Sequence, residues 1–230
     1  MYHKEAHYLT FEGSLCRMRT GCPWRDLPEE LGKWNTLFKR FNAWSKKDIF
    51  YLLFKLLSDN TDTEWLFIDG SIVRAHQHSS GAASTEDEAI GKSRGGRSTK
   101  IHLAVDSYGF PVHVELSGGQ THDIVHAESL VANSSASDFV IADKGYDSRT
   151  FRDFIEKQGT TAVIPYRRNS RKPDKNIDDV LYHYRHLVEN VFARIKHFRA
   201  IATRYAKLAR NYASMLALAF IMIWLPMWVD

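Results

Sequence analysis

Cysteine is scarce in this 230-residue chain, and the two that occur, Cys16 and Cys22, exclude two kinds of site. Two cysteines are too few for a disulfide framework, and their spacing does not match a structural zinc site. Long apolar runs are scarce too. The one candidate, 213–229, is short of a full membrane span and is interrupted by Pro226, so we expect a buried C-terminal helix. The polar, His-rich start does not resemble a signal peptide. These absences predict a cytoplasmic protein with reduced thiols and no membrane segment.

Charge is unevenly distributed along the chain, although the net charge is only +4. Residues 1–60 carry a net charge of +3, residues 61–143 a net −7 and residues 144–230 a net +8. An acidic middle followed by a basic end is typical of a metal-binding centre beside a surface that binds a polyanion. Chance segregation of charge, which is common, would give the same pattern.

Residues 1–60 predict a small helical region. An apolar stripe over 34–44 indicates a helix whose cations Lys39 and Arg40 lie off the stripe, and a further helix is expected over 49–57. A helix, a turn and a basic helix form the outline of a helix-turn-helix, in which Lys39 and Arg40 would contact DNA. A plain three-helix bundle explains the same pattern equally well.

From residue 61 onwards the pattern changes to that of an α/β protein, with helical segments between the later strands. The stretch 79–98 is rich in Gly and Ser, and we expect a mobile loop there. The expected strands are 65–69, 101–105, 112–116, 139–143 and 162–165, and the expected helices among them are 123–133 and 148–158.

Two of the expected strands end in an aspartate, Asp69 and Asp143. Active sites of open α/β sheets lie at the carboxyl ends of the strands, and Glu189, on a later helix, could reach the same edge. Carboxylates packed that closely require a cation, and oxygen ligands select Mg²⁺ or Mn²⁺. Two such ions would suit the cleavage of a phosphodiester.

Three other aspartates compete with this assignment, and we expect local roles for them. Asp106 lies in a hairpin turn, where an aspartate accepts hydrogen bonds from nearby backbone. Asp147 and Asp123 each precede an expected helix and look like N-cap residues.

The segment 182–196 predicts a helix with an unusual charged stripe. Tyr182, Arg185, Glu189 and Lys196 fall within an arc of about 60° when successive residues are placed about 100° apart. The opposite side of the helix is apolar. An acid between cations suits a carboxylate that holds a metal while its neighbours bind phosphate. An ordinary amphipathic helix with an exposed charged edge is the alternative.

The spacing Tyr182-x2-Arg185-x3-Glu189-x6-Lys196 resembles the signature around the third acid of the DDE transposases of bacterial insertion sequences, in their family-five group. The segments around Asp69 and Asp143 are similar to those around the first two acids of that family. Further similar segments are Arg19–Pro28 with Trp34-Asn35, Thr99–His102 and Ile201–Tyr212.

This resemblance implies a ribonuclease H-like fold, in which helices flank a mixed sheet. It also implies a small N-terminal all-helical DNA-binding region, 1–60, followed by a catalytic domain, 61–230. Asp69, Asp143 and Glu189 would hold two Mg²⁺ or Mn²⁺ ions.

The resemblance further implies that Tyr182, Arg185 and Lys196 contact the DNA backbone near the cleaved phosphate. A basic run between the second and third acids would add phosphate contacts, although a solvated loop explains it equally well. The run consists of Arg167, Arg168, Arg171 and Lys172.

The expected reaction is hydrolysis at the terminal inverted repeats of a transposon, followed by attack of the freed 3′-hydroxyl on target DNA. The expected partner is double-stranded DNA, bound by a homodimer in the bacterial nucleoid. Two alternatives stay open. One is a ribonuclease H-like nuclease that cleaves without joining, and the other is a non-catalytic derivative that binds DNA ends and represses.

Overall fold

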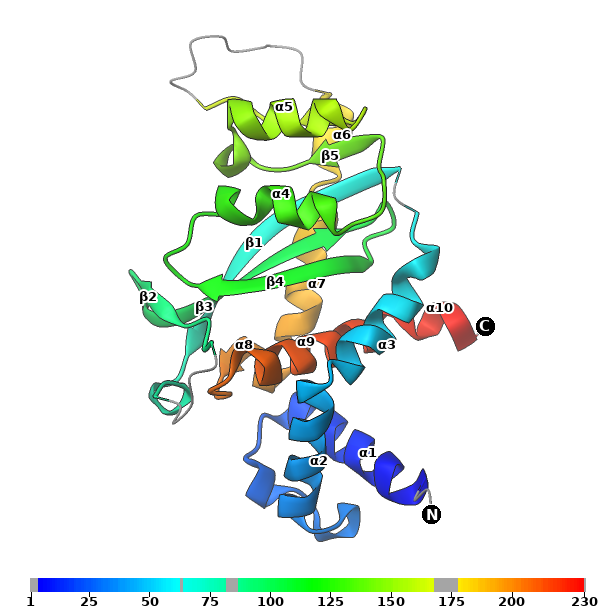
Figure 1. Cartoon of the computed structure of the whole chain (residues 1–230), viewed down its shortest axis with the longest axis vertical. Coiled ribbons are helices and arrows are strands. Elements are labelled where there is room, and N and C mark those ends of the chain that lie inside the picture. The colour runs from blue at the N-terminus through cyan, green and yellow to red at the C-terminus, as the bar shows by residue number, and fades with distance from the viewer. Residues whose placement is uncertain (1–3, 63, 82–86, 168–177, 230) are drawn as a thin grey trace.

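The computed structural model describes residues 4–62, 64–81, 87–167 and 178–229. Within these ranges seven strands form one mixed sheet with the order β2-β3-β1-β5-β6, in which β4 pairs with β3 and β7 with β1 (Figure 1). This arrangement confirms the predicted α/β fold with a mixed sheet between helices. The strands are β1 (Trp65–Ala75), β2 (Gly91–Ser93), β3 (Gly96–Val105), β4 (Pro111–Gly118), β5 (Phe139–Ile141), β6 (Thr161–Val163) and β7 (Thr203–Arg204).

Strand β1 is the centre of the sheet. It pairs antiparallel with β3, from Phe67 opposite Val105 to Arg74 opposite Ser98, and parallel with β5. The sequence predicts only 65–69 as a strand, because polar residues and Gly70 follow. The strand continues through them because β3 supplies hydrogen-bond partners as far as Arg74.

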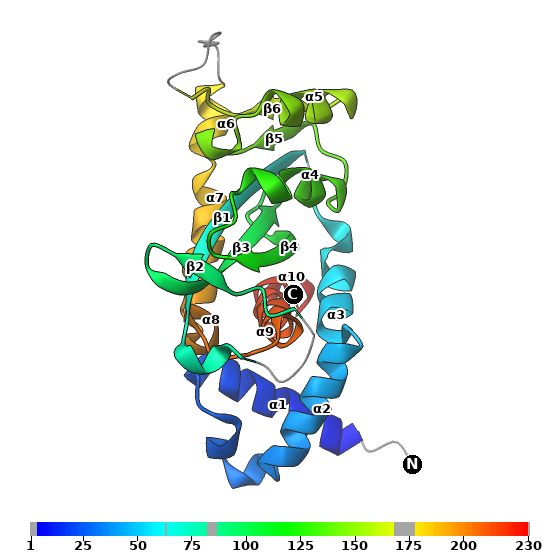
Figure 2. The same ribbon diagram turned by 60° about the vertical axis from the view of Figure 1, so that its left-hand side comes forward.

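Helices cover both faces of this sheet (Figure 2). Phe67 and Ile141 belong to a core that α7 and α9 cover, whereas Ile68 and Val140 belong to a second core under α4 and α5. The helices are α1 (Lys4–Thr20), α2 (Trp34–Lys46), α3 (Ile49–Leu57), α4 (Ile124–Ala132), α5 (Arg149–Lys157), α6 (Asp179–His183), α7 (His186–Lys196), α8 (Arg199–Ala202), α9 (Ala209–Trp224) and α10 (Pro226–Val229).

The N-terminal helices pack against the C-terminal helix α9. Phe54 of α3 lies 5.1 Å from Phe220 of α9 between ring centroids, and both rings are fully buried. The boundary expected at residue 60 therefore separates two parts of the chain that share one hydrophobic core. Helix α9 is largely buried, as the sequence predicts. No helix among the described residues is both long enough and apolar enough to span a membrane.

Two sequence expectations need correction. The predicted loop 79–98 ends in a regular hairpin of β2 and β3, in which Gly91 pairs with Ser98, while its residues 82–86 lie outside the described residues. A glycine-rich segment can form such a hairpin because Gly96 adopts the positive φ of 96° that the turn requires. The predicted continuous helix over 182–196 is interrupted, since α6 ends at His183 and α7 begins at His186.

Candidate functional site

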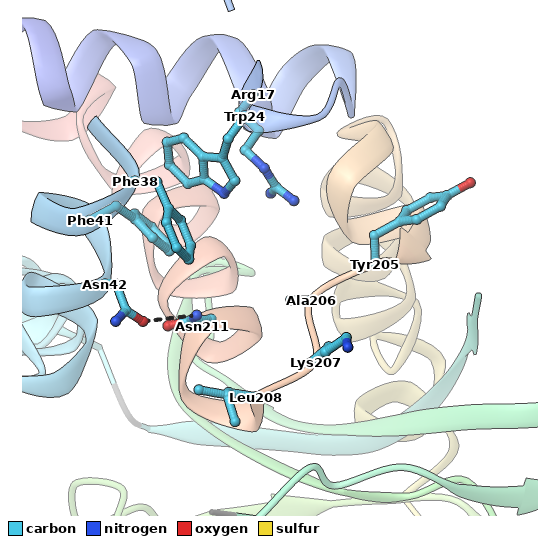
Figure 3. A pocket seen from close by; sticks show the side chains of 10 residues that line it. All are labelled: Arg17, Trp24, Phe38, Phe41, Asn42, Tyr205, Ala206, Lys207, Leu208 and Asn211. Carbon is cyan, nitrogen blue, oxygen red and sulfur yellow. Dashed lines mark hydrogen bonds between the residues drawn. The ribbon is translucent and has the colours of Figure 1, made fainter. Parts of the chain in front are cut away.

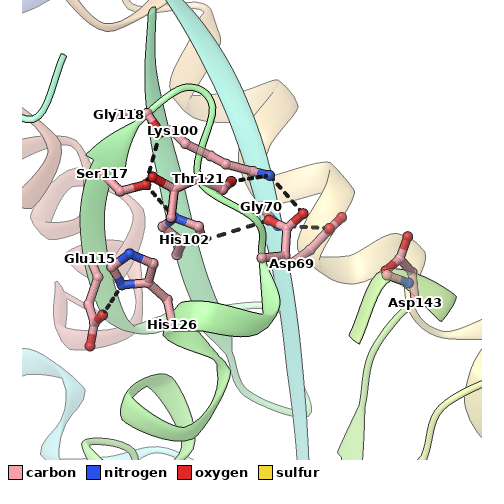
Figure 4. A network of polar contacts seen from close by, with 12 residues as sticks. Asp69, Gly70, Lys100, His102, Glu115, Ser117, Gly118, Thr121, His126 and Asp143 are labelled. Carbon is pink, nitrogen blue, oxygen red and sulfur yellow. Dashed lines mark hydrogen bonds and ion pairs between the residues drawn. The ribbon is translucent and has the colours of Figure 1, made fainter. Parts of the chain in front are cut away.

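The first two acids lie on neighbouring strands, at the point where β5 ends beside the middle of β1. Strands β1 and β5 are parallel, with Phe67 opposite Ile141, and Asp69 and Asp143 each follow two residues later. Because side chains alternate between the faces of a strand, both carboxylates start from the face that α7 covers. Figure 4 shows Asp69 and Asp143 at this edge of the sheet. Their mutual repulsion contributes to the raised pKa of Asp69.

The third acid reaches the same edge through an arginine. Arg185, just before α7, lies with Nη1 3.2 Å from Oδ2 of Asp69, although the two residues are 116 positions apart in the sequence. Its Nη2 donates to Oε1 of Glu189, one turn further along α7. The structure thus places one guanidinium between Asp69 and Glu189.

The rest of the charged stripe also lies along this edge. The guanidinium of Arg185 lies 6.0 Å from the ring centre of Tyr182, and Nζ of Lys196 donates to Oγ of Ser71 at 2.6 Å. Tyr182, Arg185, Glu189 and Lys196 stay together despite the break between α6 and α7, because a turn at 184–185 continues the chain in nearly the same direction.

Burial controls the charge of Asp69. Burial raises the pKa of this carboxyl, whereas the hydrogen bond from the Gly70 amide and the positive charge of Arg185 lower it. The negative charges of Asp143 and Asp123 add to the increase, and the pKa that results from all these contributions is about 6. A carboxylate in this position gains from an added cation, because a cation offsets both its burial and its acidic neighbours.

The three acids fit a hard divalent cation by the chemistry of their donor atoms, since all are carboxylate oxygens. In the described part of the chain, however, no group of three or more His, Cys, Asp or Glu side chains lies close enough together to hold a metal ion. The contacts of Arg185 give the physical reason, because its guanidinium lies between Asp69 and Glu189.

The loop that carries Asp143 is tied down by Arg167. Oδ1 of Asp143 accepts from the Gly145 amide at 2.7 Å, and the guanidinium of Arg167 donates to the carbonyls of Lys144 and Gly145 at 3.2 and 2.8 Å. Arg167 is nevertheless exposed. The other residues of the predicted basic run, Arg168, Arg171 and Lys172, lie outside the described residues.

The two residues of α2 that were predicted to contact DNA, Lys39 and Arg40, have different surroundings. Lys39 is exposed. Arg40 instead points at α1, where its Nη1 donates to the carbonyl of Ala6 and, at 2.8 Å, to Oγ1 of Thr10. These hydrogen bonds give Arg40 a packing role that the pattern on α2 alone did not reveal, and its contact with DNA stays a prediction.

Neither predicted N-cap makes a capping hydrogen bond, although Asp123 does occupy the N-cap position of α4. Asp147 does not cap α5, which Ser148 precedes; its carboxylate accepts from Arg152 at 3.0 Å and from the Arg167 amide at 2.7 Å. Asp123 precedes α4 but makes no capping hydrogen bond. The expected local role of Asp106 is confirmed, because it accepts from the amides of Tyr108 and Phe110.

Asp123 belongs to the site instead. Nζ of Lys100, on β3, donates to Oδ2 of Asp123 at 2.7 Å. A Cβ added to Gly70 would overlap Oδ1 of Asp123, so this carboxylate lies directly against the backbone that follows Asp69. The sequence signal that could have indicated this contact is the alternation in Thr99–His102, which places Lys100 and His102 on one face of a strand.

A chain of polar contacts continues from Lys100 and Asp123 into the protein (Figure 4). His102 accepts from or donates to Oγ of Ser117 through Nε2 at 2.8 Å, and its ring stacks on that of His126 at 4.1 Å. Nδ1 of His126 lies 2.6 Å from Oε2 of Glu115. Burial lowers the pKa of His102 to about 3, with smaller contributions from His126 and Lys100, so His102 is neutral at pH 7.

A pocket of about 420 Å³ lies away from the acids, between α1, α2 and the start of α9 (Figure 3). Aromatic and amide side chains form most of its wall, and none of the three predicted acids contributes to it. Its lining residues are Arg17, Trp24, Phe38, Phe41, Asn42, Tyr205, Ala206, Lys207, Leu208 and Asn211.

Comparison with known proteins agrees with this architecture. The "Putative transposase for insertion sequence element IS6501" of Brucella ovis is 35% identical over 128 residues, which cover 55% of this chain and 98% of that protein. The "Uncharacterized protein y4sN" of Sinorhizobium fredii is 33% identical over 99 residues, or 43% of this chain and 73% of that protein.

Among solved structures, the piggyBac transposase in its synaptic complex with hairpin DNA aligns with a TM-score of 0.62 at 12% identity. The alignment covers 95% of this chain but only 64% of that one. It supports the predicted ribonuclease H-like fold. Residues 2–54 match the family described as "Putative transposase of IS4/5 family". Residues 60–225 match the "Transposase DDE domain" family, and the chain therefore belongs to the DDE transposases.

Proposed function

We propose that this protein cuts double-stranded DNA at the ends of an insertion sequence and joins the freed ends to target DNA. The DDE family implies a DNA-cleaving and strand-transferring enzyme, and its members generally use a divalent metal ion. The observation that supports the proposal best is the pairing of Asp69 and Glu189 with one guanidinium, next to the carboxyl end of β5, which Asp143 follows.

Asp69, Asp143 and Glu189 are the residues that would hold Mg²⁺ or Mn²⁺. A divalent cation bound there would activate water and stabilise the leaving oxygen. For both Asp69 and Glu189 to bind it, Arg185 must give up at least one of its two ion pairs. A guanidinium released in this way can bind a DNA phosphate, because it matches the planar, bidentate geometry of phosphate oxygens.

Neither chemical step requires a protein nucleophile. In the first, water attacks phosphorus, the bond from phosphorus to the 3′ oxygen breaks, and the products are a 3′-hydroxyl and a 5′-phosphate. In the second, that 3′-hydroxyl loses its proton and its oxygen bonds to a target phosphorus, whose own 3′ oxygen leaves. One phosphodiester is thus exchanged for another.

The cations along this edge would position the DNA backbone. Tyr182, Arg185 and Lys196 lie beside the acids, and Arg167 is exposed next to the loop of Asp143. Arg168, Arg171, Lys172 and, on α2, Lys39 would add phosphate contacts. Because a transposon has two ends, we propose that two copies of the chain act together on the DNA.

The test is incubation of the protein with labelled duplexes that carry the element's own ends, with Mg²⁺ and a target plasmid. We expect nicked ends and joined products from the wild type, and neither from Glu189→Gln. Cleavage without joining would instead indicate a nuclease. Binding without cleavage would indicate a repressor and would overturn the proposed enzyme.

A further inference from the structure

Buried polar atoms without a hydrogen-bond partner gather beside the predicted acids. In the described part of the chain four side-chain atoms are of this kind, and three of them are Nδ1 of His102, Oδ1 of Asp123 and the hydroxyl of Tyr146. Such atoms are uncommon in native proteins, because each loses its water without a replacement. Asp123 connects the three, since its Oδ1 lies 3.7 Å from Nδ1 of His102 and its charge acts on Tyr146, and we infer that they line one site for a polar molecule.

Asp123 and His102 form one side of this site. Lys100 holds Oδ2 of Asp123 at 2.7 Å, which leaves Oδ1 pointing towards Nδ1 of His102 at 3.7 Å. This distance is too long for a direct hydrogen bond. Polar atoms separated in this way are often bridged by water, and the fully buried ring of His102 has little freedom to close the gap itself.

Tyr146 defines the other side. It follows Asp143 in the short helix η5 (Lys144–Tyr146), and its side chain is fully buried against α4 and β5. Burial, and then the negative charges of Asp123, Asp69 and Asp143, raise the pKa of Tyr146 well above its usual range. The phenol therefore keeps its proton and can donate a hydrogen bond towards these acids.

The contact of Asp123 with Gly70 places this site relative to the predicted acids. The overlap that a Cβ would cause there places Oδ1 of Asp123 on the opposite side of the Gly70 backbone from α7. Asp69 is the residue before Gly70, and Tyr146 comes three residues after Asp143. The cluster of His102, Asp123 and Tyr146 thus lies against the backbone that follows Asp69 and Asp143, on the side of β1 that faces away from α7.

We propose that His102, Asp123 and Tyr146 form a pocket that binds ordered water, and that this water holds in place the backbone segments that carry Asp69 and Asp143, so that the two carboxylates can bind the divalent cation. A carboxylate acceptor, a phenol donor and a neutral imidazole give one water the three hydrogen bonds that buried waters typically make. The inference rests on the proposed function. It makes Tyr146 and Asp123 positioning residues rather than metal ligands.

The test is the Mn²⁺ affinity of Tyr146→Phe, measured by titration calorimetry together with thermal unfolding of the metal-free protein. The substitution keeps the buried ring and removes only a hydroxyl that makes no hydrogen bond within the described part of the chain. We expect a small change in unfolding temperature and a loss of Mn²⁺ affinity of about tenfold, as for other residues that orient metal ligands. Asp123→Asn should weaken Mn²⁺ binding to a similar degree.

Matched controls are Tyr108→Phe, which removes an exposed phenol, and Glu128→Gln, which removes an exposed charge from α4. Both should bind Mn²⁺ as the wild type does. If Tyr146→Phe also retains wild-type affinity, the water pocket is wrong while the metal site stands. If only Asp123→Asn loses affinity, Asp123 acts without the pocket, and the inference is again overturned. A wild type that binds no Mn²⁺ would overturn the proposed function and this inference together.

Discussion

Burial affects the pKa of Asp69 more than any single neighbour does, and the pKa of this carboxyl in the folded protein is about 6. Between the ordinary value of 3.8 and about 6, the folded protein holds this proton more tightly than the unfolded chain. In the metal-free protein, the stability contributed by Asp69 is therefore full below 3.8 and is lost as the pH rises to about 6.

Metal binding should show the opposite dependence, since a divalent cation binds the deprotonated carboxylate. We predict that Mn²⁺ affinity falls as the pH drops through about 6, where Asp69 takes up its proton. Titration calorimetry at about pH 5 and about pH 8 measures this difference. Equal affinities at the two pH values would show that Asp69 is not a ligand.

Gly70 is the residue whose lack of a side chain allows the site to assemble. We predict that Gly70→Ala destabilises the protein by about 1–3 kcal/mol, because the new methyl group displaces the carboxylate of Asp123 from Lys100. Thermal unfolding measures the change. Gly95→Ala is the control, because a Cβ there meets only open space and Oγ of Ser93 at 3.9 Å. A Gly70 variant as stable as this control would contradict the packing described.

Between elements, Arg204 holds together three distant segments. This fully buried arginine of β7 donates to Oγ1 of Thr99 on β3 at 2.6 Å, to the carbonyl of Ala89 at 3.2 Å, and to that of Ala206 at 2.9 Å. Its guanidinium also lies 5.0 Å from the ring centre of Tyr212 on α9. None of these partners is one of the predicted acids, and the role of Arg204 is structural.

We predict that Arg204→Met lowers stability by about 3 kcal/mol, because the buried carbonyls lose a charged donor that methionine does not replace. For a chain of this length the midpoint of thermal unfolding should drop by about 6–12 °C. Lys207→Met, which removes a nearby exposed cation, should change it little. Equal midpoints for the two variants would show that the Arg204 contacts do not stabilise the fold.

The strands and helices around the site differ in how well the sequence predicts them. Short apolar runs were enough to predict a strand before Asp69 and another before Asp143, because these signals are local. The pair of Lys100 and Asp123 could not be predicted, since an aspartate before a helix looks like a cap wherever its side chain points. Only the packing of α4 on β3 determines that this carboxylate turns to a lysine instead. The course of β1 beyond residue 69 likewise depends on its partner strand.

At the scale of the whole molecule, we expect the affinity for DNA to come mainly from contacts between cationic side chains and phosphates. Each phosphate contact releases counterions, so affinity should fall steeply with salt. We predict that Arg167→Ala combined with Arg168→Ala reduces the slope of log affinity against log salt concentration by about one unit for each phosphate that is no longer neutralised. Fluorescence anisotropy at several salt concentrations measures it. Arg149→Ala is the control, since this exposed cation lies on α5. An unchanged slope in the double variant would mean that the basic run is solvated surface.

The central claim is that Asp69, Asp143 and Glu189 hold the metal ions with which the protein cuts DNA. Asp143→Asn tests it directly, because the amide keeps the shape and an acceptor oxygen for the Gly145 amide but removes the charge that favours a divalent cation. The variant should fold and bind DNA, since DNA affinity rests on the cations. Asp153→Asn, an exposed acid on α5, is the control.

The decisive measurement is the rate at which Asp143→Asn cleaves labelled transposon ends in Mg²⁺, with the wild type and Asp153→Asn measured alongside. We predict that the wild type and Asp153→Asn cleave the DNA and that Asp143→Asn does not. Asp143→Asn should also lose most of the thermal stabilisation that Mg²⁺ gives the wild type. Cleavage by Asp143→Asn at a rate comparable to the wild type would show that Asp143 is not a metal ligand and would contradict the three-carboxylate site.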